Sequence, residues 1–504
     1  MKHEPSTDET SPEVSGNVKA ECRSHAVKLR IAAITLACLP FVLLEIGLRL
    51  FSSPAAVSEA IDNDPLVDLH QLRPLFVLDK SADQWVIPPG RYNFFRPASF
   101  SAIKAPHTRR IFVLGGSTTQ GRPYSTETAF STWLQLRLQA ASPEWSYEVV
   151  NCGGVSYASY RVAKILKEAL EHQPDAIVLY TGHNEFLEDR TYAEVRQYSW
   201  ARRTASRIGN HSKIIQWLKK QVAIVPTQST VDSEVNARLD HAGGLESYQR
   251  DPQWRNAVEA HFESKLAEMI QAVRAAGIPL VLCVPASEIV NTPPIKTQLA
   301  LDLSELDKSN FQQAMEIASD DSADATKRIA AAKTCLEIDA DHAGAQFILG
   351  RLLYNYGNAK SARPHLIAAR DWDVCPLRAT TPIVAAVRDA GTQAGVFLVD
   401  TESLLDRRDP SGKLIPDQIP DPNQFVDHLH PSIAAHQAIA AEIAQLLNET
   451  LWKPTQIDAN SRYETLAREH LQSLDESYYA RGKQRLEGLH RWATGRAGQL
   501  GTGE

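Results

Sequence analysis

Cysteine is scarce in this chain of 504 residues, and its six copies are scattered without a single CxxC pair. That spacing argues against a zinc site and against a dense disulfide framework. Positive charge is not in excess either, because the net charge at pH 7 is -7. We therefore expect no nucleic-acid partner. The apolar fraction of 43% and charged fraction of 22% are those of an ordinary folded protein.

A long apolar run is also lacking near the N-terminus, where the uncharged stretch covers only residues 31–44. A membrane-spanning helix needs roughly 20 mostly apolar residues. Residues 28–51 reach that length if Glu45 and Arg49 lie at the interface. Lys and Arg precede this stretch and acidic residues follow it, which predicts a cytoplasmic N-terminus and an extracytoplasmic remainder. We expect a single-pass anchor at residues 28–51; a cleaved signal peptide and a buried core helix are the alternatives.

Short apolar stretches alternate with helical spacing from about residue 106 onward. The predicted strands lie at 110–114, 147–151, 175–180, 277–287 and 394–400. This alternation predicts a parallel sheet covered by helices on both faces, that is, a three-layer α/β/α domain. Sites in such domains lie at the carboxyl ends of the strands.

Two segments interrupt the alternation. Residues 190–255 are polar and are predicted to form loops and short helices that could cover a site. Residues 305–375 have the small and apolar positions of about one and a half tetratricopeptide (TPR) repeats, for example Leu349-Gly350, although a generic helical hairpin fits as well. Too few repeats are present to stand alone, so this insert should pack on the α/β domain and could bind a partner protein.

These features divide the chain into seven parts. They are a disordered cytoplasmic tail (1–27), the anchor (28–51), a connector (52–105), the first part of the α/β domain (106–304), the helical insert (305–375), the second part of the α/β domain (376–450) and a helical C-terminal tail (451–504).

Residues able to perform acyl chemistry follow several of the predicted strands. Ser117 ends the stretch "LGGS" after the first strand, and a serine nucleophile needs a base, a group that orients the base, and donors for an oxyanion. "NCGGVS" and "TGHNE" follow the next two strands, offering main-chain N–H groups and Asn184. "DHLHP" offers Asp427 with two histidines, and the three-residue spacing favours His430 over His428 as the partner of Asp427.

In this order the motifs resemble those of the SGNH, or GDSL, hydrolase superfamily. The resemblance covers residues 109–190, 275–300 and 380–447. It implies that Ser117 is the nucleophile, His430 the base and Asp427 its partner. It also implies an oxyanion hole that contains Asn184 and a main-chain N–H group, for which Gly154 and Ser156 are both candidates. The family's Asp before the serine is Gly116 here, and the Asp after its Asn is Glu185.

The resemblance implies a serine esterase with no metal or cofactor, and the expected anchor places this enzyme outside the cytoplasm. O-acylated envelope carbohydrate and lipid esters are the expected substrate classes. Two alternatives remain open. The same residues permit transfer of the acyl group to another hydroxyl, and an inactive hydrolase fold could instead serve as a scaffold through residues 305–375.

Overall fold

The computed structural model describes residues 71–188, 232–240 and 244–497, with residues 36, 39–41, 43, 44, 64, 67–69, 229 and 230. Residues 54–197 and 225–504 form one compact unit, to which the following description refers. The expected tail at 1–27 and most of the expected anchor at 28–51 lie outside the described residues. In the part that is described, no helix combines the length and apolar character that a membrane crossing requires.

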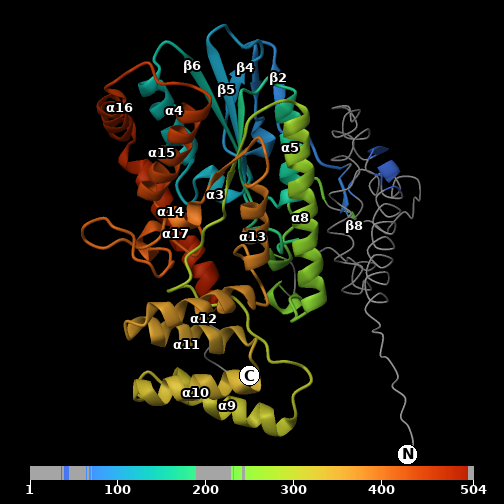
Figure 1. Cartoon of the computed structure of the whole chain (residues 1–504), viewed down its shortest axis with the longest axis vertical. Helices are drawn as coiled ribbons and strands as arrows, with labels where there is room; N and C mark the ends of the chain where they lie inside the picture. Colours follow the sequence, from blue (N-terminus) through green and yellow to red (C-terminus); the bar gives the residue numbers. More distant parts are fainter. Residues whose placement is uncertain are drawn as a thin grey trace, which may run out of the picture. The chain divides into compact units, whose positions relative to one another are not determined.

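A five-stranded parallel sheet lies at the centre of this unit (Figure 1). Its strand order is β10-β9-β7-β5-β6. Its strands are β5 (Thr108–Gly115), β6 (Ser146–Gly153), β7 (Ala176–Tyr180), β9 (Leu280–Cys283) and β10 (Val396–Val399). The α/β class and the parallel sheet predicted from the sequence are therefore confirmed. The chain turns to opposite sides of β5 to form β6 and β7, so the end of β5 is a topological switch point, where such sheets bind ligands.

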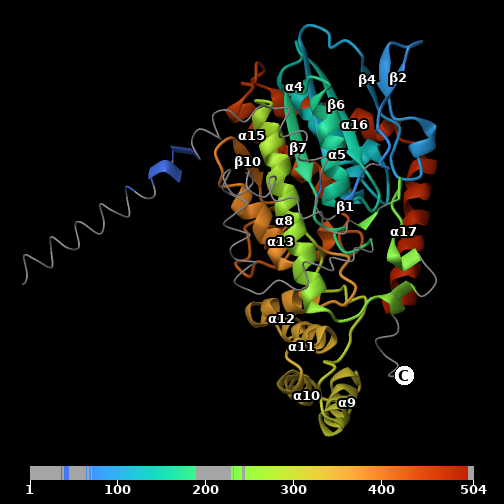
Figure 2. The ribbon, with the colours of Figure 1, turned by 90° about the vertical axis from the view of Figure 1, so that its right-hand side faces the viewer.

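Helices cover both faces of the sheet, as Figures 1 and 2 show. One face carries α5 (Ser159–Leu170), α8 (Pro252–Ala275) and α13 (Thr381–Ala390), and the other carries α4 (Phe130–Ala141) and α15 (Ile433–Thr450), with α16 (Ala459–Ser473) packed on α4. Strand β5 alternates between the two cores: Phe112 and Leu114 face α5 and α8, whereas Ile111 and Val113 face α4 and α15. Burial on both sides explains why the strand is apolar throughout this stretch.

The segment expected to be a connector is partly folded. It contains a small antiparallel sheet of β2 (Val77–Asp79), β3 (Gln84–Val86) and β4 (Ser99–Ser101). Phe76 and Phe100 from this segment meet Phe112 of β5 in edge-to-face contacts, so it covers one flank of the main core. Strands of three residues are too short to give a periodic signal in the sequence. A further pair of two-residue strands, β1 (Val67–Asp68) and β8 (Ser229–Thr230), runs parallel.

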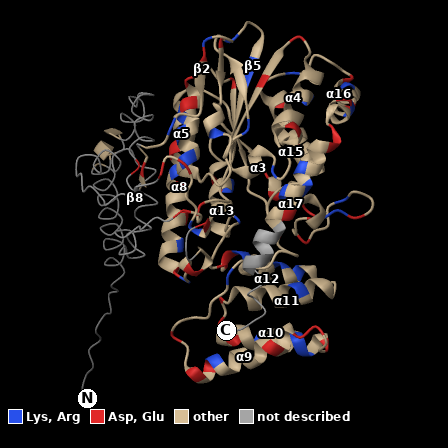
Figure 3. Cartoon of the chain, turned by 180° about the vertical axis from the view of Figure 1, so that it is seen from behind, with Lys and Arg blue, Asp and Glu red and all other residues tan. Residues whose placement is uncertain are grey.

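The insert consists of four helices, in two consecutive pairs. They are α9 (Glu305–Ser319), α10 (Ala325–Ile338), α11 (Ala343–Asn355) and α12 (Ala359–Asp371). Gly350 allows α11 and α12 to pack closely, because a Cβ there would lie 2.8 Å from Cδ2 of Leu366. Acidic and basic residues are mixed along α9 and α10, which is the pattern of a solvated surface (Figure 3). The helical character is as expected; the assignment to tetratricopeptide repeats stays a prediction.

The insert packs on the α/β domain, as its small size requires. Phe347 and Leu366 share a buried apolar cluster with Ile289, Val290 and Ile419 of the domain. The helices end at Asp371, and Val374 and Cys375, which the sequence assigned to the insert, are buried in the main core instead.

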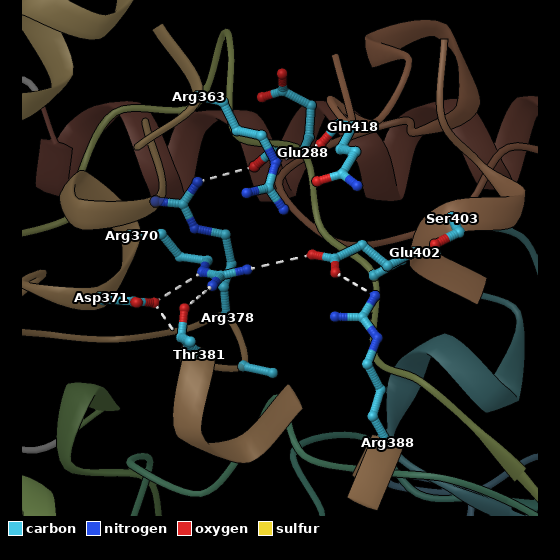
Figure 4. A network of polar contacts seen from close by, with 12 residues as sticks. Glu288, Arg363, Arg370, Asp371, Arg378, Thr381, Arg388, Glu402, Ser403 and Gln418 are labelled. Carbon is cyan, nitrogen blue, oxygen red and sulfur yellow. Dashed lines mark hydrogen bonds and ion pairs between the residues drawn. The ribbon is translucent and has the colours of Figure 1, made fainter. Parts of the chain in front are cut away.

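Polar contacts fix the same junction (Figure 4). Arg370 at the end of α12 is 3% exposed; its Nη2 donates to Thr381 Oγ1 at 2.9 Å, and its Nη1 lies 3.6 Å from Glu402 Oε1. Glu402, in the short helix α14 (Thr401–Leu404), also pairs with Arg388 at 2.8 Å. Because α13 and α14 flank β10, this network connects the insert to the edge of the sheet.

We expect Arg370→Met to lower the free energy of unfolding by about 1–2 kcal/mol, because the buried Arg370 loses its hydrogen bond to Thr381 and its ion pair with Glu402. Lys360→Met on the same helix is the matched control, since Lys360 is exposed, and should change stability by less than about 0.5 kcal/mol. Urea denaturation followed by circular dichroism measures both. Equal stabilities for the two variants would show that the network does not hold the insert in place.

Two buried histidines make the fold sensitive to acid. His183 and His436 are 5% and 1% exposed, and burial, reinforced by the charge of His430, lowers the pKa of each to about 3. In the unfolded chain a histidine titrates near about 6.5. Between these values the unfolded state binds more protons, so lowering the pH favours unfolding.

We therefore expect each of these histidines to reduce the free energy of unfolding by about 1.4 kcal/mol per pH unit below about pH 6.5. His436 Nδ1 accepts from the Phe130 N–H at 3.2 Å, a role that an Asn oxygen can take over. In His436→Asn, the free energy of unfolding should therefore fall less steeply as the pH is lowered, by the contribution of one histidine. Urea titrations at pH 7.5, 6 and 5 test this; an unchanged slope in the variant would contradict the assignment.

Candidate active site

Ser117, His430 and Asp427 form one hydrogen-bonded chain, although the first and second are 313 residues apart. Ser117 is the first residue of the short helix α3 (Ser117–Gln120), which begins just beyond β5. His430 lies in the loop before α15, and its Nε2 is 2.8 Å from Ser117 Oγ. Its Nδ1 is 2.7 Å from Asp427 Oδ2. The structure thus brings together three residues that the sequence singled out separately.

The carboxylate of Asp427 is held in place by the turn that follows it. It accepts hydrogen bonds from the main-chain N–H groups of Leu429 (3.0 Å) and His430 (2.8 Å), besides that from the His430 ring. Burial alone raises the pKa of Asp427, but the rings of His430 and His428 and these hydrogen bonds more than compensate, and the pKa is well below its ordinary value. An ionised Asp427 fixes the proton of His430 on Nδ1, which leaves Nε2 free to accept from Ser117.

His428 is the less suitable partner, as the spacing predicted. Its Nδ1 is 3.7 Å from Asp427 Oδ1, beyond hydrogen-bond distance, whereas that of His430 is at 2.7 Å. Both rings line the same cavity as Ser117. Only His430 contacts the serine hydroxyl.

The two glycines before Ser117 are explained by close approaches. A side chain on Gly115 would collide with the carbonyl oxygen of Tyr180 on β7 and with Thr119. A Cβ on Gly116 would lie 2.5 Å from Asn184 Nδ2. Gly116 stands where the family has Asp, and its lack of a side chain is what lets Asn184 lie beside the serine.

Of the candidate oxyanion donors, Asn184 and Ser156 face the cavity and Gly154 does not. The Gly154 N–H donates to the Gly115 carbonyl oxygen at 3.0 Å and is therefore occupied. Ser156 lines the cavity with a left-handed backbone (φ 64°), and its N–H has no hydrogen bond to any residue that the structure describes. Asn184 also lines it, with Nδ2 donating to the Tyr157 carbonyl oxygen at 3.0 Å.

The departure from the family at Glu185 has a local explanation. Its carboxylate accepts from both the N–H and the hydroxyl of Ser159, each at 2.8 Å, at the start of α5. The longer side chain thus satisfies a helix N-terminus instead of facing the serine. The change leaves Asn184 in position.

The C-terminal helix α17 (Glu476–Ala497) contributes to the site, which the sequence did not predict. The cavity at Ser117 has a volume of about 470 Å³, and Arg485, Gly488 and Leu489 of α17 form part of its wall. Arg122, immediately after α3, lines it too. Leu239 and Asp240, from the segment predicted to cover a site, also belong to the wall. Tyr478, Gly482 and Arg485 do recur at helical spacing, but the sequence does not reveal what that face packs on.

Comparison with known proteins agrees with this geometry. A model of the GDSL-like Lipase/Acylhydrolase family matches residues 113–343. The match includes Ser117 and Asn184 and ends at the start of α11, so Asp427 and His430 lie beyond it. No curated protein matches the sequence.

Solved structures give distant likenesses. A GDSL-like lipase from Bacteroides thetaiotaomicron is 10% identical, with a TM-score of 0.28, over 69% of this chain and 94% of that one. A protein described as lipolytic and of the G-D-S-L family, from Desulfitobacterium hafniense, is 9% identical, with a TM-score of 0.27, over 67% and 99% of the two chains. The family match covers residues 113–343, and together with the geometry of the site it indicates an ester-hydrolysing enzyme.

Proposed function

We propose that this protein is a serine esterase in which Ser117 is the nucleophile, His430 the general base and Asp427 the residue that orients it. The observation that supports this most strongly is the continuous hydrogen-bond chain from Asp427 through His430 to Ser117. Its order and distances are those that nucleophilic acyl transfer requires.

The reaction follows from the position of each proton. Ser117 Oγ attacks the ester carbonyl carbon while its proton passes to His430 Nε2, and Asp427 stabilises the imidazolium that forms. The Ser156 N–H and Asn184 Nδ2 hold the negatively charged oxygen of the tetrahedral intermediate. The intermediate collapses as His430 returns the proton to the departing alcohol oxygen. Water, deprotonated by His430, then attacks the acyl-enzyme and releases the acid and free Ser117.

Location and partners belong to the same proposal. The lysine and arginine bias around residues 28–51 supports a membrane anchor with the catalytic domain outside the cytoplasm. O-acylated envelope carbohydrate or lipid esters would then be accessible substrates. Exposed Leu306, at the start of the insert, and exposed Leu301, just before it, support a protein partner for residues 305–375.

Replacing members of the hydrogen-bond chain tests the catalytic roles. Ser117→Ala and His430→Ala should each lower kcat for p-nitrophenyl acetate by about a thousandfold or more. His428→Ala is the matched comparison, because it removes a neighbouring ring of the same cavity that does not contact Ser117; we expect a loss below about tenfold. If His428→Ala were inactive and His430→Ala active, the assignment of the base would be wrong.

The oxyanion donors give a second test. Asn184→Ala should reduce kcat by about a hundredfold, with a smaller effect on KM, since a donor to the oxyanion acts mainly in the transition state. Ser156→Gly keeps the main-chain N–H and suits the left-handed backbone, so activity should be largely retained. A loss in Ser156→Gly as large as that in Asn184→Ala would mean that the Ser156 hydroxyl, not its N–H, matters.

A further inference from the structure

Arginines gather on one side of the cavity that contains Ser117. Arg122 and Arg485 both line it, the first from the turn after α3 and the second from α17. Arg96, two residues beyond the lining residue Phe94, lies close enough for its charge to act on Arg122 and to be influenced by Arg485. All three side chains are half-buried.

None of the three has an acidic partner in the described part of the chain. Arg96 and Arg122 form no side-chain hydrogen bond there, and the Nε of each is buried without an acceptor. Arg485 Nη1 donates only to neutral acceptors, the carbonyl oxygens of Pro123 (3.4 Å) and Tyr124 (2.6 Å). Glu127 and the deeply buried Asp427 are near enough for their charges to act on Arg96 and Arg122, but among the described residues no ion pair joins either of them to these arginines.

Several buried arginines elsewhere in the protein form ion pairs: Arg110 lies 2.7 Å from Glu148, and Arg161 lies 2.7 Å from Glu188. Others have only neutral acceptors within the described ranges, such as Arg378, which donates to the carbonyl oxygens of Glu288 and Thr292. What distinguishes the cluster at the cavity is that three arginines lie together beside Ser117. Burial lowers the pKa of Arg122, and the charges of Arg96 and Arg485 lower it further. The charges of Glu127 on Arg96 and of Asp427 on Arg122 oppose this repulsion but are weaker than it, so a bound anion would relieve it.

The helix that carries Arg485 is firmly attached. Tyr478 Oη and Thr128 Oγ1 are 2.8 Å apart, and the rings of Tyr478 and Tyr124 stack with centroids 6.2 Å apart. One turn later Gly482 packs directly on Tyr124, leaving no room for a side chain. Arg485, on the same face, is thus positioned over the cavity before any ligand binds.

We propose that the ester cleaved at Ser117 carries an oxyanion, either a carboxylate or a phosphate, and that Arg122 and Arg485, with Arg96 behind them, bind this group. The inference rests on the esterase function proposed above. Guanidinium groups present several N–H donors in the planar geometry that both oxyanions accept. Leu187 and Leu377, which also line the cavity, provide apolar surface for the remainder of the substrate.

Three acetate esters of matched phenols test the proposal with the purified full chain: those of 4-hydroxybenzoate, 4-hydroxyphenyl phosphate and the neutral 4-hydroxybenzamide. Arg122→Gln and Arg485→Gln should each lower the ratio of anionic to neutral kcat/KM about tenfold relative to wild type. Using this ratio cancels any loss common to all three esters. The ester with the larger drop identifies carboxylate or phosphate as the preferred group.

Arg481→Gln is the control, because Arg481 lies one turn before Arg485 on α17, is exposed and does not line the cavity. It should leave the ratio unchanged. Ratios in Arg122→Gln and Arg485→Gln equal to those of wild type would overturn the anion site while leaving the esterase function intact. Hydrolysis of none of the esters would contradict the esterase function instead.

If none of the esters is hydrolysed, binding of the same compounds to Ser117→Ala still tests the anion site. In saturation-transfer NMR, 4-acetoxybenzoate or 4-acetoxyphenyl phosphate should bind at least tenfold more tightly than 4-acetoxybenzamide. The preference should disappear in Ser117→Ala/Arg122→Gln and persist in Ser117→Ala/Arg481→Gln. Equal affinities for the charged and neutral compounds would refute the proposal.

Discussion

The contact between His430 Nε2 and Ser117 Oγ, at 2.8 Å, is the interaction on which the rest of the site depends. It joins the switch point of the sheet, where β5 ends, to a loop near the end of the catalytic domain. The serine is fixed by the central strand and by two glycines that allow β7 and Asn184 to come close. The histidine is fixed by Asp427, whose carboxylate also accepts hydrogen bonds from two N–H groups of the turn. Each partner is thus positioned by its own element.

In the sequence, the insert lies between Ser117 and the loop that contains His430. The insert is held against the α/β domain, so it does not separate these two residues. Phe347 and Leu366 pack on the domain, and Arg370 contacts α13 and α14. The C-terminal helix has a different relation to the site, because α17 supplies part of the cavity wall. Part of the cavity wall therefore comes from a segment outside the strand and helix alternation, and such segments are where enzymes of one fold acquire different substrates.

Much of this arrangement could be predicted from the sequence, for identifiable physical reasons. The five strands are apolar stretches that the sheet buries on both faces, so their composition alone marks them. The positions of Ser117 and Asn184 in the site were predicted from the ends of the strands that precede them. The pairing of Asp427 with His430 was predicted from their three-residue spacing. The β2–β4 sheet was missed because its strands have three residues each. Arg122 and Arg485 were missed because only tertiary contacts bring α17 to the end of β5. Whether Gly154 or Ser156 supplies the oxyanion donor also could not be predicted from the sequence, because it depends on which N–H group already has a hydrogen bond in the folded protein.

The most direct test of the central claim is the covalent reactivity of Ser117. The full chain would be treated with a fluorophosphonate and digested, and the modified residue identified by mass spectrometry. We expect a single phosphonyl adduct on Ser117, strongly reduced in His430→Ala and largely unchanged in His428→Ala. An unmodified protein, or an adduct on another serine with Ser117 intact, would contradict it.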